Sequence, residues 1–290
     1  MKKIAVVGSA NMDLMLTLDR FPEVGETVLG KNYQYTFGGK GANQAVAVKR
    51  LGGDVKFFAR LGKDDNGQKM ENNFKKENLP VVIAHSNLHS GFATIINFQQ
   101  DNRIMVFSGC NMESTPEYEQ QIQNQLAEFD LILLQCEIAP SLNFAVAKWG
   151  HEHGKTVILN PAPVDKFETR ILPYVDYLLP NETEAALILK ENQNLDLNKI
   201  ITTQGSLGAS YTKDNKQYLV PALHGLNVVD TTGAGDAFVG GFVYGLANDY
   251  PISKCVMCGN ITGGKNTESL GATTGMIDQK TLNELLNSQA

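Results

Sequence analysis

The chain has 290 residues, of which 42% are hydrophobic, and its 31 acidic and 25 basic side chains give a net charge of −6. This length suits one large domain, or one domain with a small accessory piece. The acidic balance, without any run of lysine or arginine, argues against nucleic acid as a partner, because phosphate backbones are bound by basic faces. No apolar stretch approaches the ~18 residues of a membrane span, so we expect no membrane partner and a cytoplasmic protein.

Apolar runs of strand length alternate with helical patterns along most of the chain. We expect buried strands at residues 4–7, 55–59, 131–135, 156–159, 177–179 and 200–203. Helices are expected between them, at 41–51, 67–78, 116–128, 142–153 and 182–189, and two more follow at 237–247 and 253–266. This alternation predicts an α/β fold in which helices cover both faces of a mostly parallel sheet.

Two regions break the alternation and have strand character without helical periodicity. Residues 13–18 and 26–37 form one expected hairpin, and residues 91–99 and 103–108 form another that turns at Gln100-Asp101-Asn102. Because their faces mix polar and apolar side chains, we predict a small separate sheet that acts as a lid. Glycines at its junctions, at 38–39 and 91, would absorb hinge motion. A static flap or a dimerisation surface is compatible with the same sheet.

These boundaries divide the chain into two expected units. The main α/β domain would comprise residues 1–13, 39–90 and 109–290, and the lid would comprise residues 14–38 and 91–108.

Two other patterns have structural explanations. Cys255-Val256-Met257-Cys258 is a CxxC motif, but it lies in an apolar, helical segment, so we expect structural cysteines rather than a redox or zinc site. Residues 259–266 match GxxxxGK of a phosphate loop, yet no strand precedes them and Asn266 replaces the hydroxyl residue. We expect a glycine-rich helix there.

The segment Asp230-Thr231-Thr232-Gly233-Ala234-Gly235-Asp236 leads directly into an apolar helical pattern. Small residues leave the first-turn N–H groups of a helix bare, and with the helix dipole they form an anion site. A carboxylate would repel a phosphate, so Asp236 makes sense as a base that takes a proton from a hydroxyl attacking that phosphate. A helix N-cap after a glycine turn explains the local sequence equally well.

Two clusters near the N-terminus suit a hydroxyl-rich ligand. Gly38-Gly39-Lys40-Gly41-Ala42-Asn43-Gln44 places glycines before a helix, with Lys40 and Asn43 one turn apart. Ser9-Ala10-Asn11-Met12-Asp13 follows the first strand, at the sheet edge where open α/β proteins bind ligands. The structural alternatives are a plain glycine turn for the first cluster and an Asx-type turn for the second.

Two later strand ends suit a nucleotide and its metal. In Pro180-Asn181-Glu182-Thr183-Glu184, Asn181 and Glu184 could surround a hydrated Mg²⁺, or they could form a capping box. Thr203-Gln204-Gly205-Ser206-Leu207-Gly208 could bind nucleotide phosphates, or it could be an ordinary glycine turn.

Together these clusters resemble the signatures of the ribokinase-type (PfkB) sugar kinase family, in the same order and over nearly the whole chain. The matching segments are residues 8–13, 38–45, 160–163, 180–184 and 230–236. The resemblance implies a three-layer α/β/α fold with a small β-sheet lid. It also implies ATP-dependent phosphorylation of the primary hydroxyl of a pentose, first of all D-ribose to D-ribose 5-phosphate. A kinase for another sugar or a nucleoside, and a non-catalytic sugar-binding regulatory protein, remain as alternatives.

The resemblance further implies roles for individual residues. Asp236 would be the catalytic base, beside an anion hole formed by the backbone of Gly233, Ala234, Gly235 and Asp236. The sugar would be held by Asn11, Asp13, Gly39, Lys40, Asn43, Glu137 and Asp236. ATP would contact Asn181, Thr203, Gly205, Ser206, Gly208, Gly235 and, at its adenine end, Asn260. Asn181 and Glu184 would order the waters of Mg²⁺.

The resemblance also implies a potassium site and a homodimer that forms through the lid sheets. The cation residues would be Asp230, Thr232, Thr267, Leu270 and Gly275. Two features depart from the family pattern: Gly275 stands where these kinases often have a serine, and the connection at 190–199 is short. The first departure puts potassium activation in doubt.

Overall fold

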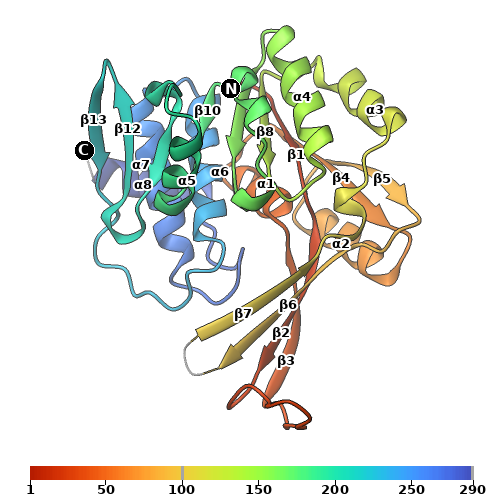
Figure 1. Cartoon of the computed structure of the whole chain (residues 1–290). Helices are drawn as coiled ribbons and strands as arrows, with labels where there is room; N and C mark the ends of the chain where they lie inside the picture. The colour runs from red at the N-terminus through yellow and green to blue at the C-terminus, as the bar shows by residue number, and fades with distance from the viewer. Residues whose placement is uncertain (99–100, 289–290) are drawn as a thin grey trace.

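The computed structural model describes residues 1–98 and 101–288, and its centre is a six-stranded sheet (Figure 1). All neighbouring strands in this sheet are parallel. Their order is β10 (Tyr177–Leu178), β9 (Thr156–Asn160), β8 (Leu131–Gln135), β1 (Ile4–Val7), β4 (Val55–Gly62) and β5 (Val81–Ser86). The parallel sheet expected from the sequence is therefore confirmed, with β5 as an additional edge strand.

Helices cover both faces of the central sheet. Ile4 and Val6 of β1 point into one hydrophobic core and Ala5 and Val7 into another, as the alternation of side chains along a strand requires. The first core packs against α1 (Lys40–Arg50), α2 (Asp65–Lys76) and α6 (Ala234–Ala247). The second packs against α3 (Pro116–Leu126), α4 (Pro140–Glu152) and α5 (Glu182–Glu191). The fold is thus the predicted three-layer α/β/α arrangement.

Two C-terminal helices extend the layer that contains α6. They are α7 (Ile252–Asn266) and α8 (Gln279–Ser288). Residues 259–266 lie within α7, which confirms the expected glycine-rich helix, and the thiols of Cys255 and Cys258 are buried. No helix in the described part of the chain is long and apolar enough to span a membrane.

One expected strand belongs to a different sheet. The segment predicted at 200–203 forms β11 (Ile201–Thr203), which pairs antiparallel with β12 (Ala209–Lys213), and β12 pairs with β13 (Lys216–Val220). Isolated parallel bridges, Leu178 with Ile200 and Asn181 with Thr203, hold this sheet beside β10. The predicted position was correct, but the strand belongs to this separate sheet and meets the central sheet only through the two bridges to β10.

A four-stranded sheet projects from the main body (Figure 1), and we call it the lid sheet. Its order is β3 (Asn32–Gly38), β2 (Asn11–Thr17), β6 (Gly91–Phe98) and β7 (Asp101–Phe107). The two hairpins join through a parallel pairing of β2 with β6.

Several boundaries in the lid sheet differ from the prediction. β2 begins at Asn11 rather than at Asp13, so residues 11–13 belong to this sheet and not to the main domain alone. The strand expected from residue 26 begins at Asn32, because the side chain of Glu26 binds the backbone N–H of Glu23 and stabilises a loop there. β7 begins at Asp101, inside the predicted turn at 100–102. Gln99, the expected end of the preceding strand, and Gln100 lie outside the described residues.

Candidate active site

The N-terminus of α6 is open. Gly233 occupies the N-cap position in the left-handed region, with φ of 74°, and a Cβ atom there would collide with the carbonyl oxygen of Ala272. A Cβ on Gly235 would meet no atom within 4 Å, so there is free space beside the first turn. The N–H groups of Gly235 and Asp236 can therefore approach an anion. The N–H of Ala234, which was also expected in the anion hole, donates to the carbonyl of Thr231 at 3.2 Å.

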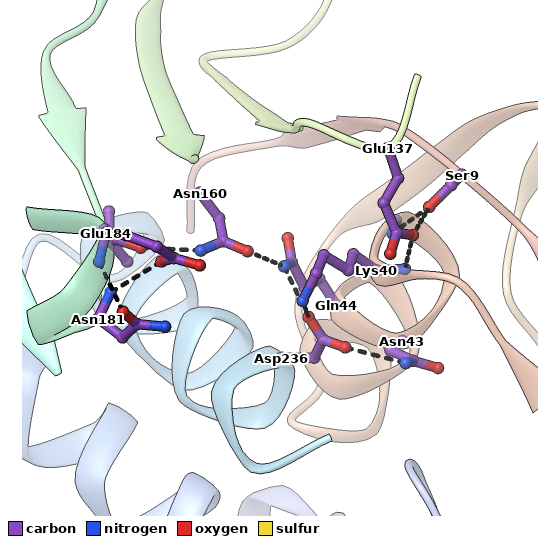
Figure 2. Close-up of polar contacts among 11 residues, drawn as sticks. Ser9, Lys40, Asn43, Gln44, Glu137, Asn160, Asn181, Glu184 and Asp236 are labelled. Carbon is purple, nitrogen blue, oxygen red and sulfur yellow. Dashed lines mark hydrogen bonds and ion pairs between the residues drawn. The ribbon is translucent and has the colours of Figure 1, made fainter. Parts of the chain in front are cut away.

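Asp236 is not the N-cap, so that alternative is wrong. It is the third residue of α6, and its side chain is only 7% exposed. Asn43 Nδ2 and Gln44 Nε2 each donate a hydrogen bond of 2.9 Å to its carboxylate (Figure 2). Lys40 Nζ lies 3.9 Å from Oδ1. These contacts hold a carboxylate at the edge of the anion site.

The donors to Asp236 come from α1, whose sequence fits this position. Gly39 caps the helix with φ of 90°, where a Cβ would lie 2.8 Å from the backbone of Ala10. Glu137 Oε2 accepts hydrogen bonds from the first helical N–H, that of Lys40, at 2.9 Å and from Ser9 Oγ at 2.6 Å. The positive end of the helix dipole also stabilises a carboxylate at this position.

Lys40 lies among several carboxylates. The negative charge of Asp236 raises the pKa of Lys40 despite the opposing effect of burial, with smaller contributions from Glu137 and Glu184. Its ammonium group is therefore firmly charged and available to neutralise an incoming anion.

Asp13 lies near the same group of charges. Burial, reinforced by the negative charges of Glu137 and Asp236, raises the pKa of Asp13 to about 7. Its Oδ1 is buried without a hydrogen-bond partner in the described part of the chain. A buried oxygen of this kind favours a ligand that donates a hydrogen bond.

Asn11 is buried and its oxygen is already engaged. Asn111 Nδ2 donates a 2.8 Å hydrogen bond to Asn11 Oδ1, and Asn111 Oδ1 accepts from the backbone N–H of Ala10. A Cβ on Gly91 would collide with both side chains. Asn111 was missed by the sequence analysis, because no motif surrounds it.

A chain of amides connects Asp236 to the candidate nucleotide side. Gln44 Nε2 also donates to Asn160 Oδ1 at 3.1 Å, and Asn160 Nδ2 donates to the carbonyl of Leu179 at 2.8 Å. Figure 2 shows this row leading from Asp236 to Asn181 and Glu184. Gln44 and Asn160 lie in segments that match the family signatures, but the sequence predicted no role for either residue.

Asn181 and Glu184 form the capping box of α5. Glu184 Oε2 accepts from the N–H of Asn181, and Asn181 Oδ1 accepts from the N–H of Glu184, both at 2.9 Å. Asn181 is exposed and Glu184 is half-buried. The box uses one carboxylate oxygen of Glu184, Oε2, and leaves Oε1 to accept other hydrogen bonds.

The other candidate ATP residues lie at the second sheet. Thr203 ends β11 beside Asn181, and Gly205 and Ser206 are exposed on the turn that follows. Gly208 is a structural requirement, because its φ is 109° and a Cβ would collide with the carbonyl of Val220. Asn260 supports the end of the same sheet by donating to the carbonyl of Val220 at 2.8 Å. The short connection at 190–199 contains the end of α5 and a 3₁₀ turn at Leu197–Lys199.

The candidate cation residues are mostly engaged by the protein. Asp230 Oδ1 accepts from the N–H and hydroxyl of Thr232, and Asp230 Oδ2 accepts from the N–H of Gly271. Burial would raise the pKa of Asp230, but these hydrogen bonds hold it below its ordinary value. The carbonyl of Thr267 accepts from the N–H groups of Val229 and Asp230.

The fold and the site define a class of α/β protein in which an open helix N-terminus lies beside a buried carboxylate and a sheet bearing polar side chains. Comparison with known proteins identifies the class. The chain belongs to the pfkB family of carbohydrate kinases, whose model matches residues 1–279.

Individual relatives agree with this family assignment. A ribokinase of Bacillus subtilis (strain 168) is 37% identical over 294 residues, which cover 99% of this chain and 100% of the relative. The crystal structure of a ribokinase from Thermotoga maritima is similar with a TM-score of 0.89 at 30% identity, covering 99% of this chain and 100% of that one. An Arabidopsis thaliana ribokinase complexed with ribose and ATP gives a TM-score of 0.88 at 28% identity, covering 98% of both chains.

Proposed function

We propose that this kinase transfers the γ-phosphoryl group of ATP to the primary hydroxyl of D-ribose, forming D-ribose 5-phosphate. The observation that carries the proposal is the position of Asp236, a buried carboxylate held by two amide donors at the open N-terminus of α6. The similarity to ribokinases over the whole length of the chain supports ribose as the sugar.

In the proposed reaction, the sugar hydroxyl attacks the γ-phosphorus while its proton moves to Asp236. The bond from the γ-phosphorus to the bridging oxygen breaks, and ADP leaves with that electron pair. The N–H groups of Gly233, Gly235 and Asp236 stabilise the charge on the phosphoryl oxygens, and Lys40 adds a cation nearby. The N–H of Ala234 donates to the carbonyl of Thr231 instead. Because phosphoryl transfer has a loose transition state, positioning and charge neutralisation are the main contributions of the protein.

The sugar would lie between α1 and the start of the lid sheet. Asp13 offers its free buried oxygen to a sugar hydroxyl, Asn43 lies beside Asp236, and Gly39 allows close approach of the backbone. Because the oxygen of Asn11 is engaged by Asn111, Asn11 would offer its N–H₂ group instead. Glu137 positions Lys40 and Ser9 and would act on the sugar through them.

ATP would lie along the row that leads from Asp236 to β11. Its phosphates would approach Gly235, and its other groups would contact Asn181, Thr203, Gly205 and Ser206. Gly208 and Asn260 would shape this surface. Mg²⁺, when bound with ATP, neutralises charge on the phosphates, and Glu184 Oε1 suits a role in ordering its waters.

The first test is an ADP-release assay with Mg-ATP and a panel of D-ribose, 2-deoxyribose, fructose, adenosine and pseudouridine. We expect selective turnover of ribose. Selective turnover of another compound would keep the kinase and change its substrate. Silence over the whole panel, with ribose still binding by calorimetry, would favour the sugar-binding regulatory alternative. The use of ATP leads us to propose the cytoplasm as the location.

A further inference from the structure

The last residue of α7, Asn266, connects two backbone carbonyls beside the anion site. Its side chain is fully buried. Nδ2 donates to the carbonyl of Thr232 at 3.0 Å and to that of Ala272 at 3.1 Å. The opposite orientation of the amide would face its oxygen toward two acceptors, so the network fixes which atom is the nitrogen.

Both carbonyls flank the glycine that begins α6. Thr232 precedes Gly233 in the chain, and the carbonyl of Ala272 lies where a Cβ of Gly233 would be. Two carbonyl oxygens that converge in a buried place need a positive partner, since unsatisfied acceptors are costly there. The two N–H groups of the Asn266 amide supply that partner and hold the 271–275 segment against the start of α6.

The potassium site implied by the family does not fit these residues. The Thr232 carbonyl is bound by Asn266, and the Thr267 carbonyl accepts two backbone N–H groups. The N–H of Gly271 donates to Asp230 Oδ2, whereas a bound cation would require oxygen atoms alone around it.

Gly275 adds a further disagreement. It offers no side-chain oxygen, and a Cβ at this position would lie 2.5 Å from the carbonyl oxygen of Asn266. The backbone around Asn266 and Gly275 is therefore packed too closely for the serine that many members of the family have here.

We propose that the side-chain amide of Asn266 takes the place of a monovalent cation, so that this kinase assembles its anion hole without potassium. Asn266 is then a positioning residue, which acts on the phosphoryl group through the backbone of Gly233. The consequence for turnover rests on the proposed function, whereas the consequence for ion binding does not.

The first experiment measures the melting temperature and turnover of the wild-type protein in potassium, sodium and tetramethylammonium chloride at equal ionic strength. We expect melting temperatures that agree within about 1 °C and equal kcat values. A saturable increase of either quantity with potassium would overturn the proposal, because it would show that the cation binds despite Asn266.

Two variants test the amide directly. Asn266→Asp keeps the shape but replaces the donor with a negatively charged oxygen among carbonyls, which creates a demand for a cation. In tetramethylammonium we expect its melting temperature to fall by about 5 °C and to recover in part with potassium. Asn266→Ala should lower kcat about tenfold, with little change in the KM values, because the donors of the anion hole lose their support.

Asn143→Ala is the matched control. Like Asn266, Asn143 is a buried asparagine whose Nδ2 donates to a backbone carbonyl, here that of Gln135. The Oδ1 atoms of both asparagines are buried without a hydrogen-bond partner in the described part of the chain. We expect it to lose stability equally in all three salts. Wild-type melting temperature and kcat in Asn266→Ala, or potassium indifference in Asn266→Asp, would contradict the proposal. If no sugar is phosphorylated while the salt pattern holds, only the proposed function fails.

Discussion

The protonation of single carboxylates decides what this site can do. Asp236 receives hydrogen bonds on both oxygens, from Asn43 and Gln44, so it is held in one orientation. Asp236→Asn should lower kcat about 10³-fold, since the amide cannot accept the hydroxyl proton. Calorimetry should show ATP binding retained. The amide of Asn43 can turn its oxygen toward the new N–H₂ group, so the fold should persist, as melting would show; wild-type turnover in this variant would contradict the assignment of the base.

Asp13 gives the site a pH dependence near neutrality. Its pKa is raised to about 7, and its ionised form accepts hydrogen bonds from sugar hydroxyls better than its neutral form. We therefore expect kcat/KM for the sugar to rise between about pH 6 and pH 8. In Asp13→Asn the KM for the sugar should be higher at all pH values and this rise should be absent. A sugar KM equal to that of the wild type would show that Asp13 does not contact the substrate.

Ionisation of Asp13, which should raise kcat/KM for the sugar, should lower the stability of the folded protein. Its pKa is 3.8 in an ordinary environment and about 7 in the folded protein, so the folded state binds more protons between these values. The free energy of unfolding therefore falls as the pH rises from about 4 to about 7. Asp13→Asn lacks this loss, and at pH 8 its melting temperature should exceed that of the wild type by a few degrees, about 2–5 °C. Near pH 4 the difference should shrink, and a constant difference would contradict the raised pKa.

At the scale of elements, the glycines that join the lid sheet to the main body are required by close packing. The sequence suggested a hinge at 38–39 and 91. A Cβ on Gly38 would collide with the carboxylate of Asp13, and one on Gly91 would collide with Asn11. These contacts join residues that are distant in the sequence, so no local pattern could reveal them.

Gly38→Ala tests this packing. The added methyl group must displace the carboxylate of Asp13, so we expect the KM for the sugar to rise about tenfold while the KM for ATP stays unchanged. Gly30→Ala is the matched control in the same sheet region, since its Cβ would have an ordinary contact of 3.5 Å with Leu18. Equal sugar KM values for the two variants would show that the site tolerates the change at Gly38.

Elements with strong periodicity could be predicted from the sequence, and those that depend on distant partners could not. The wholly buried strand β1 and the glycine-rich helix α7 lie as predicted. The hairpin of β12 and β13 was missed. The signal in the sequence was the pair Asp214-Asn215 at its turn, since aspartate and asparagine tolerate the positive φ values that both residues adopt. In the site, glycine-rich segments of the sequence indicated Asp236 and Lys40. The role of Asn266 could not be predicted in this way, because it depends on the carbonyls of Thr232 and Ala272, which are 34 and 6 residues away in the sequence.

At the scale of the whole molecule, the lid sheet leaves surface that a second copy of the chain could cover. Both edge strands, β3 and β7, lack a further neighbour among the described strands, and open edges favour association. Large apolar side chains are exposed on both faces of these strands, Ile104 and Val106 on one face and Tyr33 and Phe107 on the other. The register places Ile104 on the same face of the sheet as Asp13. We therefore propose a homodimer in which the lid sheets of two copies pack together.

Ile104→Asp tests this association. Ile104 is 54% exposed in the single chain, so a charge there should leave the folded protomer intact but disfavour a covered apolar interface. Sedimentation equilibrium should show the wild-type protein at twice the mass of the chain and the variant shifted toward the single chain, with an unchanged far-ultraviolet spectrum. Leu187→Asp is the control, the same change of charge at an exposed apolar side chain of α5, away from the lid sheet. A wild-type protein that sediments as a single chain at micromolar concentration would exclude this dimer, and the exposed side chains of β7 would then belong to a solvent-facing sheet.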